Sequence, residues 1–589
     1  MPQLEDRLLA GEINYLDYYF CRFIAELEAN RLHDSLTHLI ADLSHALTEQ
    51  HSCLDLSQRG DAENLITRLK ETQCVGDGTE PTPLVLEGSK LYLHRYYSYE
   101  SRIAASLVAR NRPLEVDASQ FERAIRTSFP NNDQPVDWQQ VATLQALTRQ
   151  LSIITGGPGT GKTSTVVKIL AILLENQDIT VKLAAPTGKA AMRLNESING
   201  ALPELPKSIA SRIPDQVQTI HRLLGMRTDG RSARYNENHR LPVEFLVVDE
   251  VSMIDLPLMD RLLRAIPDHT RLLLIGDPDQ LPSVEVGNIL ADICRYPAGF
   301  SESYRKLTRE ILNIELPAGP ANHLLTDTIS QLKTNYRFST NKGIGLIAES
   351  IREGIGDLPA DDDEMFIHNL AELDQDPGKQ LALAYADYLE HLRQASTTPT
   401  ALIASFDRSR ILSPVREGSL GVARLNQQIE AHLRATGWVA DTHEFYHGRP
   451  VIITRNDYTL GLFNGDTGIT VLDPADNQLK VAFKGIDGEL KLYLASRLPP
   501  HETCFAMTIH KSQGSEFDHV TLILPDNLPE KSERVMTREL LYTAVTRARS
   551  SISVYLNRAT WQRTLTKTIG RNSGLGERFL SDTSQHHAQ

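Results

Sequence analysis

The residues with the clearest chemistry lie in one short loop that is rich in glycine. Backbone N–H groups wrap a polyphosphate closely only where side chains are absent and positive φ is tolerated, and glycine meets both conditions. Lys162 is spaced to reach the β- and γ-phosphates of a nucleotide, and Thr163 is spaced to offer its hydroxyl to Mg²⁺. We therefore predict that ATP and Mg²⁺ bind here. The loop consists of Gly156, Gly157, Pro158, Gly159, Thr160, Gly161, Lys162, Thr163 and Ser164.

Two adjacent carboxylates are the second chemical feature. They follow the apolar run 245–248, which predicts a buried strand. Phosphoryl transfer needs both a neutralising metal and a positioned nucleophile, so we assign Asp249 to the Mg²⁺ shell and Glu250 to polarising the attacking water. Gln280 follows the next apolar run, 271–275, and is placed to sense the γ-phosphate. The alternatives are a chance Asp-Glu pair at a strand end and a proline-rich turn around Gln280.

These loops need a parallel sheet to bring them together. Residues 151–155 are apolar and β-branched, and residues 162–174 place apolar side chains at helical spacing. A strand, a glycine loop and a helix in this order are typical of a P-loop, whereas a glycine-rich turn before an ordinary helix is the alternative. Gln139 lies on a predicted helix ahead of the loop. It is placed to reach an adenine edge, unless it is an exposed helix residue without a role.

A second predicted strand, 181–185, ends in another polar loop. Ligands of open α/β sheets bind beyond the carboxyl ends of the strands. Thr187 and Lys189 are therefore placed to contact a second ligand, with a simple helix cap as the alternative for this loop. Residues 226–243 are polar and predict a hairpin inserted into the sheet domain.

The second half of the chain repeats the α/β pattern around an insertion. The strand near 411–414 and the segment from 506 onward predict a second sheet domain. Short alternating strands between about 437 and 500, divided by Asn-Gly and Asp-Gly turns, predict a small β-barrel. Arg547 lies on a late helix, from which it would point at a nucleotide across the cleft between the domains. The predicted fold class is α/β, with sheet domains at 116–335 and 336–589.

Residues 1–115 differ from the rest because they carry no catalytic constellation. Apolar residues recur at helical intervals over 22–47 and again over 53–69. Residues 83–87 and 90–96 predict two short strands of a hairpin. We interpret this region as a helical, partner-binding domain.

The composition of the whole chain limits the remaining classes of function. Hydrophobic residues make up 41% of the 589 residues, which is enough for cores in about three or four domains. The formal net charge of −14 disfavours nonspecific nucleic-acid binding by the whole chain, so any such site must be local. We find neither a long apolar run nor a signal peptide, which predicts a cytoplasmic protein without a membrane segment. The five cysteines form no C-x-x-C pair and are expected to be buried and reduced.

An ordered set of motifs adds to these inferences. Besides the P-loop and the Asp-Glu strand, the chain carries APTGKAA, TIHRLLG, GDPDQLPSV, TNYRF, TIHKSQGSEF and YTAVTRAR. Over about residues 84–555 this set resembles superfamily 1 helicases, and its variants are most similar to the RecD family, the alpha subunits of bacterial exodeoxyribonuclease V. The resemblance implies two RecA-like motor domains that hydrolyse ATP with Mg²⁺ and move 5′-to-3′ on single-stranded DNA. It also implies RecB-like and RecC-like partners in a heterotrimer that unwinds and degrades double-stranded DNA ends in break repair.

The resemblance implies roles for individual residues as well. Positions for ATP hydrolysis are matched by Lys162, Thr163, Asp249, Glu250, Gln280, Arg337 and Arg547. Positions that contact adenine and ribose are matched by Gln139 and Glu516. Positions on the DNA track are matched by Thr187, Lys189, Thr219, His221, Thr508, His510 and Ser512.

Two alternatives stay open. A stand-alone RecD-like helicase would share the motor, but its family usually carries helix-hairpin-helix repeats in a longer N-terminal region, which we do not find here. A non-translocating P-loop ATPase would leave the segments TIHKSQG and YTAVTRAR unexplained. No cluster of carboxylates with a lysine indicates a nuclease, so nuclease activity is expected in a partner.

Overall fold

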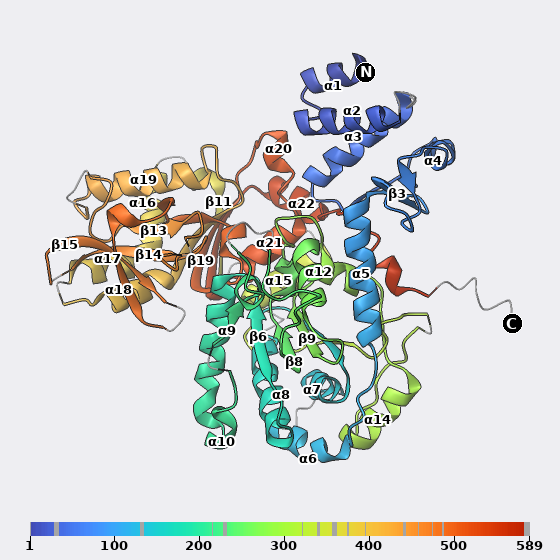
Figure 1. The fold of residues 1–589 in the computed structure, drawn as a ribbon. Helices are drawn as coiled ribbons and strands as arrows, with labels where there is room; N and C mark the ends of the chain where they lie inside the picture. The colour runs from blue at the N-terminus through green and yellow to red at the C-terminus, as the bar shows by residue number, and fades with distance from the viewer. Residues whose placement is uncertain are drawn as a thin grey trace.

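The structure, a computed structural model, describes residues 2–581 except for 29–33, 130–134, 215, 228–231, 321, 339–341, 356–357, 359–361, 374–375, 395, 440–442, 458, 474 and 486–487. In the view of Figure 1 the described chain forms a lower domain, a left domain and a module at the upper right. We call these the first α/β domain, the second α/β domain and the N-terminal module. Among the described helices, none is both long enough and apolar enough to cross a membrane.

The first α/β domain is built on a parallel sheet. Its strands are β5 (Leu151–Thr155), β6 (Val181–Ala185), β7 (Gln218–Thr219), β8 (Phe245–Val248), β9 (Arg271–Gly276) and β10 (Ile329–Gln331). They run in the order β10-β5-β9-β8-β6-β7, and every neighbouring pair is parallel. The predictions of β5, β6, β8 and β9 are confirmed, and β7 was not predicted. The sequence near Ile329 was interpreted as helical, which is wrong, because Ile329–Gln331 pairs with β5 as the short strand β10. Because the strands are parallel, the loops at their carboxyl ends meet at one edge of the sheet.

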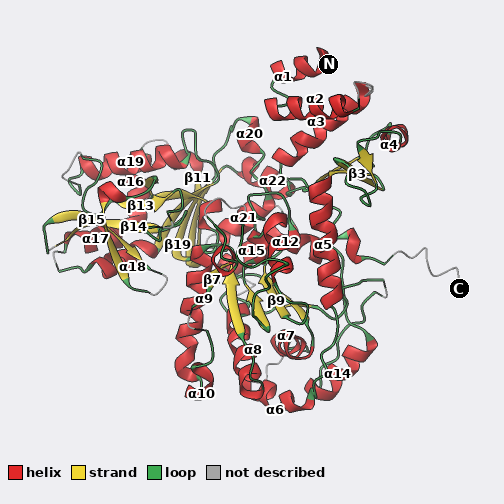
Figure 2. Cartoon of the chain, viewed as in Figure 1, coloured by secondary structure: helices red, strands yellow, loops and turns green. Residues whose placement is uncertain are grey.

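Helices cover both faces of this sheet, as Figure 2 shows. They are α6 (Ser119–Ser128), α7 (Trp138–Thr148), α8 (Lys162–Asn176), α9 (Gly188–Ala201), α10 (Lys207–Ala210), α11 (Ile220–Leu223), α12 (Leu256–Ala265), α13 (Ile289–Cys294) and α14 (Glu302–Leu312). Two hydrophobic cores result, one containing Leu170 of α8 and Leu194 of α9, the other containing Met259 of α12 and Ile293 of α13. Burial on both faces explains why the strands read as continuous apolar runs.

The second α/β domain has a five-stranded parallel sheet of its own. Its strands are β11 (Met365–Asn369), β12 (Ser409–Ser413), β18 (Ala506–Thr508), β19 (Phe517–Ile523) and β20 (Ala548–Leu556), in the order β11-β20-β19-β12-β18. Its helices are α15 (Gly343–Glu353), α16 (Pro377–Ala382), α17 (Ala386–Arg393), α18 (Pro399–Asp407), α19 (Val422–Ala435), α20 (Glu530–Glu533), α21 (Arg538–Val545) and α22 (Arg558–Thr566). The predicted α/β class is confirmed in both domains.

An antiparallel sheet is inserted between β12 and β18. Its strands are β13 (Pro450–Ile453), β14 (Thr467–Asp473), β15 (Gln478–Lys484), β16 (Leu490–Leu494) and β17 (His501–Thr503), in the order β16-β15-β14-β13-β17. The insertion was predicted near 437–500, but its last strand pairs with β13 beyond that limit. Strand pairing among the described residues leaves β16 and β17 as edges and does not close the sheet into a barrel.

The N-terminal module mixes helices with a small sheet. It contains α1 (Pro2–Leu9), α2 (Tyr15–Leu27), α3 (Asp34–Thr48), α4 (Ala62–Lys70), β1 (Cys53–Asp55), β2 (Val75–Gly76), β3 (Leu84–Glu87) and β4 (Lys90–Leu93). The predicted hairpin is confirmed as β3 and β4, with Glu87 opposite Lys90. The helix predicted over 53–69 is wrong at its start, because residues 53–55 pair with β4 as a strand and only the later residues form α4. That pairing depends on a partner almost 40 residues away, as Cys53 lies opposite Tyr92.

Helix α5 (His94–Arg110) joins the N-terminal module to the first α/β domain. Ile103 and Leu107 lie in the same core as α12, and Arg102 forms a two-pronged ion pair with Asp260 at 2.7 and 3.0 Å. The predicted domain boundary near residue 115 therefore falls after a helix that completes the first α/β core. In the predicted hairpin region, the described residues of 226–243 form isolated antiparallel bridges, Met226 with Ala233 and Asn236 with His239.

The C-terminal segment leaves the second α/β domain and returns to the module. Arg578 donates two hydrogen bonds to Glu87 at 2.8 and 2.6 Å. The Ser573 hydroxyl donates to the buried carboxylate of Glu100 at 3.0 Å. Residues 573–578 thus bind the module and α5, although the sequence assigned them to the domain that begins at 336.

Candidate ATP site between two α/β domains

The glycine loop between β5 and α8 surrounds the ammonium group of Lys162. Lys162 Nζ donates to the carbonyl oxygens of Gly156 at 2.5 Å and Gly157 at 2.9 Å. The φ angles of Gly159 and Gly161 are both +81°, in the left-handed region that favours glycine. A Cβ at Gly161 would also displace the side-chain amide of Gln139. Thr163 is half-buried and Ser164 is exposed at the start of α8.

The two carboxylates predicted to act in hydrolysis lie at the carboxyl end of β8. Burial raises the pKa of Asp249 to about 6, and the negative charge of the adjacent Glu250 adds to the rise. Glu250 has a φ of +53°, a conformation that costs energy for a residue with a side chain. Carboxylate oxygens are the donors that a divalent cation prefers, and the raised pKa of Asp249 reflects a buried negative charge that such a cation would offset.

Gln280 links the two domains directly. Its Nε2 donates to Asp277 Oδ2 at 3.0 Å in the first domain, and its Oε1 accepts from Arg547 Nη2 at 2.9 Å in the second. Arg547 was predicted on a helix but follows it, because α21 ends at Val545 and β20 begins at Ala548. It is 1% exposed and also donates to the carbonyl oxygen of Ser515 at 3.0 Å. The next residue, Leu281, donates its backbone N–H to Thr543 Oγ1 at 2.8 Å. The predicted nucleotide sensor and the predicted arginine are therefore in contact.

Glu516 is the centre of a cluster of arginines. Arg337 Nη2 lies 2.8 Å from Glu516 Oε2, Arg549 Nε lies 3.1 Å from the same oxygen, and Arg193 binds Oε1. Burial by itself raises the pKa of Glu516, but the charges of Arg193 and Arg337 outweigh it and lower the pKa to about 2. Arg337 Nη1 is buried and has no hydrogen-bond partner among the described residues. That unsatisfied donor suits a phosphate oxygen.

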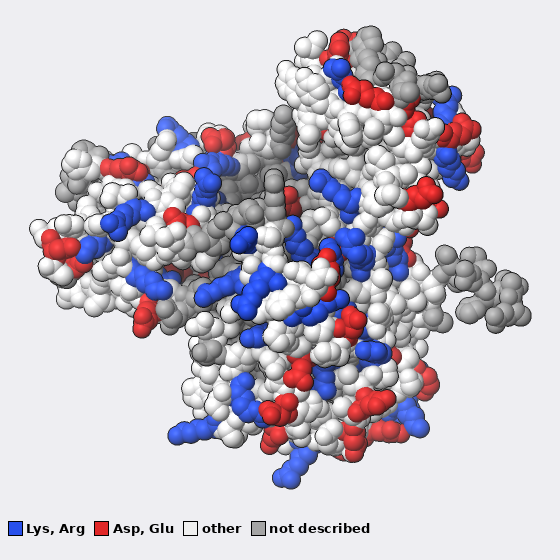
Figure 3. Space-filling view, in the orientation of Figure 1, with Lys and Arg blue, Asp and Glu red and all other residues white. Residues whose placement is uncertain are grey.

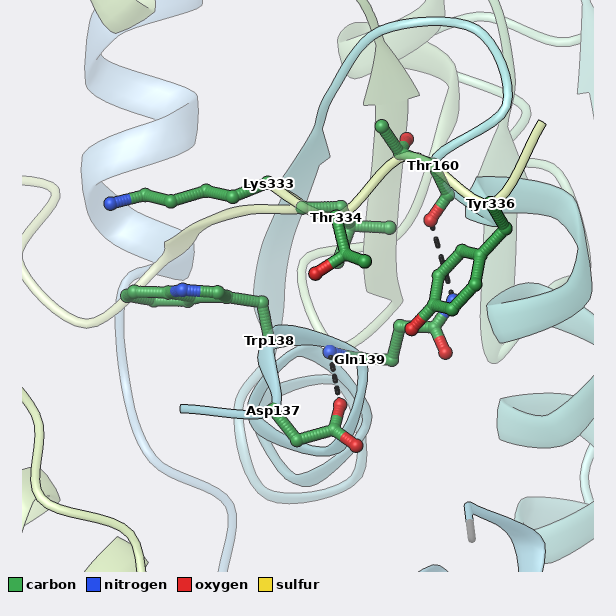
Figure 4. A pocket seen from close by; sticks show the side chains of 8 residues that line it. Asp137, Trp138, Gln139, Thr160, Lys333, Thr334 and Tyr336 are labelled. Atoms are coloured by element: carbon green, nitrogen blue, oxygen red, sulfur yellow. Dashed lines mark hydrogen bonds between the residues drawn. The ribbon is translucent and has the colours of Figure 1, made fainter. Parts of the chain in front are cut away.

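A small pocket next to the loop contains Gln139 (Figure 4). Its lining consists of Asp137, Trp138, Gln139, Thr160, Leu332, Lys333, Thr334 and Tyr336. Gln139 Nε2 donates to the carbonyl oxygen of Thr160 at 3.3 Å, and the ring of Tyr336 lies beside the Gln139 side chain. An amide and a ring next to the phosphate loop suit an adenine base. Glu516, predicted to act at the same nucleoside, is not part of this lining.

The residues predicted to contact DNA from the first domain lie at the ends of neighbouring strands. Thr187 and Thr219 both cap helices, accepting from the backbone N–H groups of Ala190 and Arg222 at 3.2 Å each. The helix cap that was given as the alternative role of the loop containing Thr187 and Lys189 is therefore present. Burial lowers the pKa of Lys189, which lies near Asp466 of the inserted sheet. Burial likewise lowers the pKa of His221.

The predicted DNA contacts of the second domain follow β18. Thr508 is the last residue of that strand, and burial lowers the pKa of His510. Ser512 is fully buried and donates to the carbonyl oxygen of Ile509 at 2.7 Å, so DNA could reach it only after this segment moves. A Cβ on Gly514 would lie 3.3 Å from the backbone N of Ala190. The two sets of residues therefore approach one another at the start of α9.

Asp277, Arg193 and Tyr336 belong to the site but were not among the predicted site residues. Asp277 follows the carboxyl end of β9, where the strand-end rule used for Asp249 would also have placed it. Arg193 lies inside α9 and had no local signal. It reaches both Glu250, at 3.8 Å, and Glu516.

The fold and the site define a P-loop ATPase built from two α/β domains with arginines of the second domain at the active centre. Family models agree with this class: that of the AAA domain matches residues 139–286, and that of the UvrD-like helicase C-terminal domain matches 503–555. The model of the N-terminal domain of the RecBCD enzyme subunit RecD matches residues 10–65.

Similar proteins identify the family. The chain is 34% identical to the RecBCD enzyme subunit RecD of Haemophilus influenzae over 534 residues, covering 84% of this chain and 81% of that protein. It is 36% identical to the subunit of the same name from Mycobacterium tuberculosis over 508 residues, covering 83% and 80%. The ATP-dependent RecD2 DNA helicase of Deinococcus radiodurans is 32% identical over 447 residues, covering 75% of this chain and 52% of that helicase. The chain belongs to the RecD family, and it is an ATP-dependent DNA helicase motor.

Proposed function

We propose that this chain moves 5′-to-3′ along single-stranded DNA as the second motor of a three-subunit complex with RecB-like and RecC-like partners, acting on double-stranded DNA ends in the cytoplasm. The single observation that carries the motor assignment is the contact of Arg547 with Gln280 across the domain boundary. Gln280 is the predicted nucleotide sensor of the first domain, and Arg547 belongs to the second domain, so a change of this contact with nucleotide state would couple hydrolysis to the arrangement of the domains. The proposed partners follow from the names of the relatives. We assign any nuclease activity of the complex to one of these partners and not to this chain.

The residues of the ATP site divide the work of hydrolysis. The glycine loop and Lys162 bind the phosphates, and Gln139 and Tyr336 hold the base. Glu516 can contact the ribose only after the arginines that pair with it are released. Thr163 and Asp249 would hold Mg²⁺, which would neutralise phosphate charge when bound. Glu250 accepts a proton from the attacking water, and Arg337 and Arg547 stabilise the charge of the transition state.

Domain motion then couples hydrolysis to movement on DNA. Thr187, Lys189, Thr219 and His221 form a grip on the first domain, and the segment 508–512 forms a grip on the second. Closing and reopening the cleft changes the distance between the grips, so one grip slides while the other holds. Gln280 reports the nucleotide state to the second domain through Arg547.

The charge distribution supports a local DNA site. The chain carries a formal net charge of −14, yet Figure 3 shows Lys and Arg side chains gathered across the middle of this view, between the left and lower domains. Phosphate contacts depend on such local clusters rather than on net charge. This placement agrees with a strand bound across both α/β domains.

The direction of travel is tested with partly double-stranded DNA. We expect the full-length chain to unwind a duplex with a single-stranded 5′ tail and to leave a duplex with only a 3′ tail essentially intact. Strand displacement with ATP measures both, and a blunt duplex and the Lys162→Gln variant supply the backgrounds. Preference for the 3′ tail would reject the proposed polarity.

The N-terminal module presents an apolar surface on α2. Tyr15, Tyr19, Phe23 and Leu27 recur at intervals of four residues, so they share one face of the helix. Between 48% and 71% of each is exposed, and Leu16 next to them is 67% exposed. A row of large apolar side chains in water is typical of a protein interface. We propose that this α2 face docks the chain onto a partner subunit, within the segment matched by the RecD N-terminal model.

Substitution on this face should separate assembly from hydrolysis. Because α5 completes the first α/β core, deleting residues 1–115 would damage the motor, so point changes are preferable. We expect Tyr19→Ser with Phe23→Ser to abolish co-purification with the partner subunits and to leave DNA-stimulated ATP hydrolysis near the wild-type rate. Leu383→Ser, which changes an exposed leucine of the second domain, is the control. If the double variant assembles normally, the docking surface lies elsewhere on the chain. If the wild-type chain binds no partner, the stand-alone helicase is the better interpretation.

A further inference from the structure

Arg193 is a cation of the ATP site to which no role has been given above. It projects from α9, pairs with Glu516 of the second domain, and lies 3.8 Å from Glu250 Oε1. Its side chain is 31% exposed, while those of Glu250 and Glu516 are 14% and 1% exposed. A single guanidinium thus lies between the carboxylate assigned to proton transfer and the arginine cluster of the other domain.

We propose that Arg193 is a positioning residue that restrains Glu250 until DNA binds to α9. Glu250 must turn its carboxylate toward the attacking water to accept a proton. A neighbouring guanidinium competes for the same oxygen, so the pair with Arg193 holds Glu250 in a resting orientation. The left-handed backbone of Glu250 is a strained conformation that the surrounding structure must hold in place.

Helix α9 connects this restraint to the proposed DNA grip. Thr187 caps the helix, and Lys189 lies one turn before Arg193 on the same face. An α-helix transmits a displacement of its first turn to the next turn because its backbone hydrogen bonds keep it stiff. Movement of Thr187 and Lys189 by a bound strand therefore moves Arg193 relative to Glu250. This inference rests on the proposed function, which places DNA at those two residues.

The opposite end of the restraint lies in the second domain. Glu516 follows the segment 508–512 and holds Arg193 by its Oε1, while its Oε2 binds Arg337 and Arg549. Arg193 is therefore held from the first domain by α9 and from the second by Glu516. Release of Glu250 requires a change in that domain contact, which links hydrolysis to the DNA-bound arrangement of the two domains.

The test compares ATP hydrolysis with and without single-stranded DNA in full-length Arg193→Gln, which keeps a long polar side chain but removes the charge. We expect the DNA-free turnover to rise about two- to five-fold, the range that one partly exposed ion pair supplies. The turnover at saturating DNA and the KM for ATP should stay near wild-type values, so the stimulation ratio falls. Arg193→Lys, which restores the charge, should recover part of the ratio.

Arg549→Gln is the matched control. Arg549 binds the same carboxylate of Glu516 at 3.1 Å, but no contact joins it to Glu250 in the described structure. We expect its stimulation ratio to stay at the wild-type value. An equal fall in both rates of Arg193→Gln, unchanged rates, or the same loss of ratio in Arg549→Gln would overturn the inference. If wild-type hydrolysis does not respond to DNA, the proposed function itself fails, which is a distinct result.

Discussion

Lys162→Gln should lose ATP turnover by at least about 10²–10³-fold at saturating single-stranded DNA, the loss that follows removal of one preorganised charge from a transition state. The ammonium donates hydrogen bonds to the carbonyl oxygens of Gly156 and Gly157 and interacts electrostatically with Asp249 and Asp277. These contacts are polar, so the substitution leaves the hydrophobic cores of the domain unchanged. Thermal unfolding should therefore change little. Lys306→Gln is the control, because that lysine is 70% exposed on α14.

Glu250→Gln separates binding from chemistry at the same site. The amide keeps the shape of the side chain but cannot accept a proton from water, so turnover should fall while ATP still binds. Titration with a fluorescent nucleotide measures binding, and phosphate release measures turnover. Substantial turnover in Lys162→Gln or Glu250→Gln would remove that residue from the assigned role.

The second large effect is expected from the arginines of the domain cleft. Arg337→Ala and Arg547→Ala should each lower DNA-stimulated turnover by about 10³-fold or more, with a much smaller change in the KM for ATP. The reason is that charge on the transferred phosphate is greatest in the transition state. Arg337 has a buried N–H group without a hydrogen-bond partner in the described structure, and this group is available to a phosphate oxygen. Arg547 already donates a hydrogen bond to Gln280, the predicted nucleotide sensor.

Stability must be measured beside these rates, because Arg547 is fully buried. Its removal leaves Gln280 Oε1 without its donor, which should cost about 1–3 kcal/mol of unfolding free energy. Chemical denaturation separates that loss from the loss of turnover in the folded enzyme. Arg408→Ala, which removes an exposed arginine of the second domain, is the matched control. Wild-type turnover in Arg337→Ala or Arg547→Ala would show that the substituted arginine has a surface or structural role and does not act in hydrolysis.

The sequence by itself determined the parts of the ATP site that depend on short-range geometry. The glycine loop spans a few residues between β5 and α8, and glycine adopts the left-handed φ angles of Gly159 and Gly161 without steric cost. Asp249 and Glu250 follow β8 directly, and parallel strands carry such loops to one edge. In each case the position of the residue relative to its own strand or helix is enough to predict where it lies.

Tertiary structure alone decided which charges meet across the cleft. Arg193 and Glu516 are 323 residues apart, and Gln280 and Arg547 are 267 residues apart. No local spacing relates such pairs, because their contact depends on how two separately folded cores pack. The same reason explains the strand at 53–55, which pairs with residues 90–92, and the return of residues 573–578 to the N-terminal module. A short strand or an extended tail has no periodicity of its own, and its structure comes from the surface against which it packs.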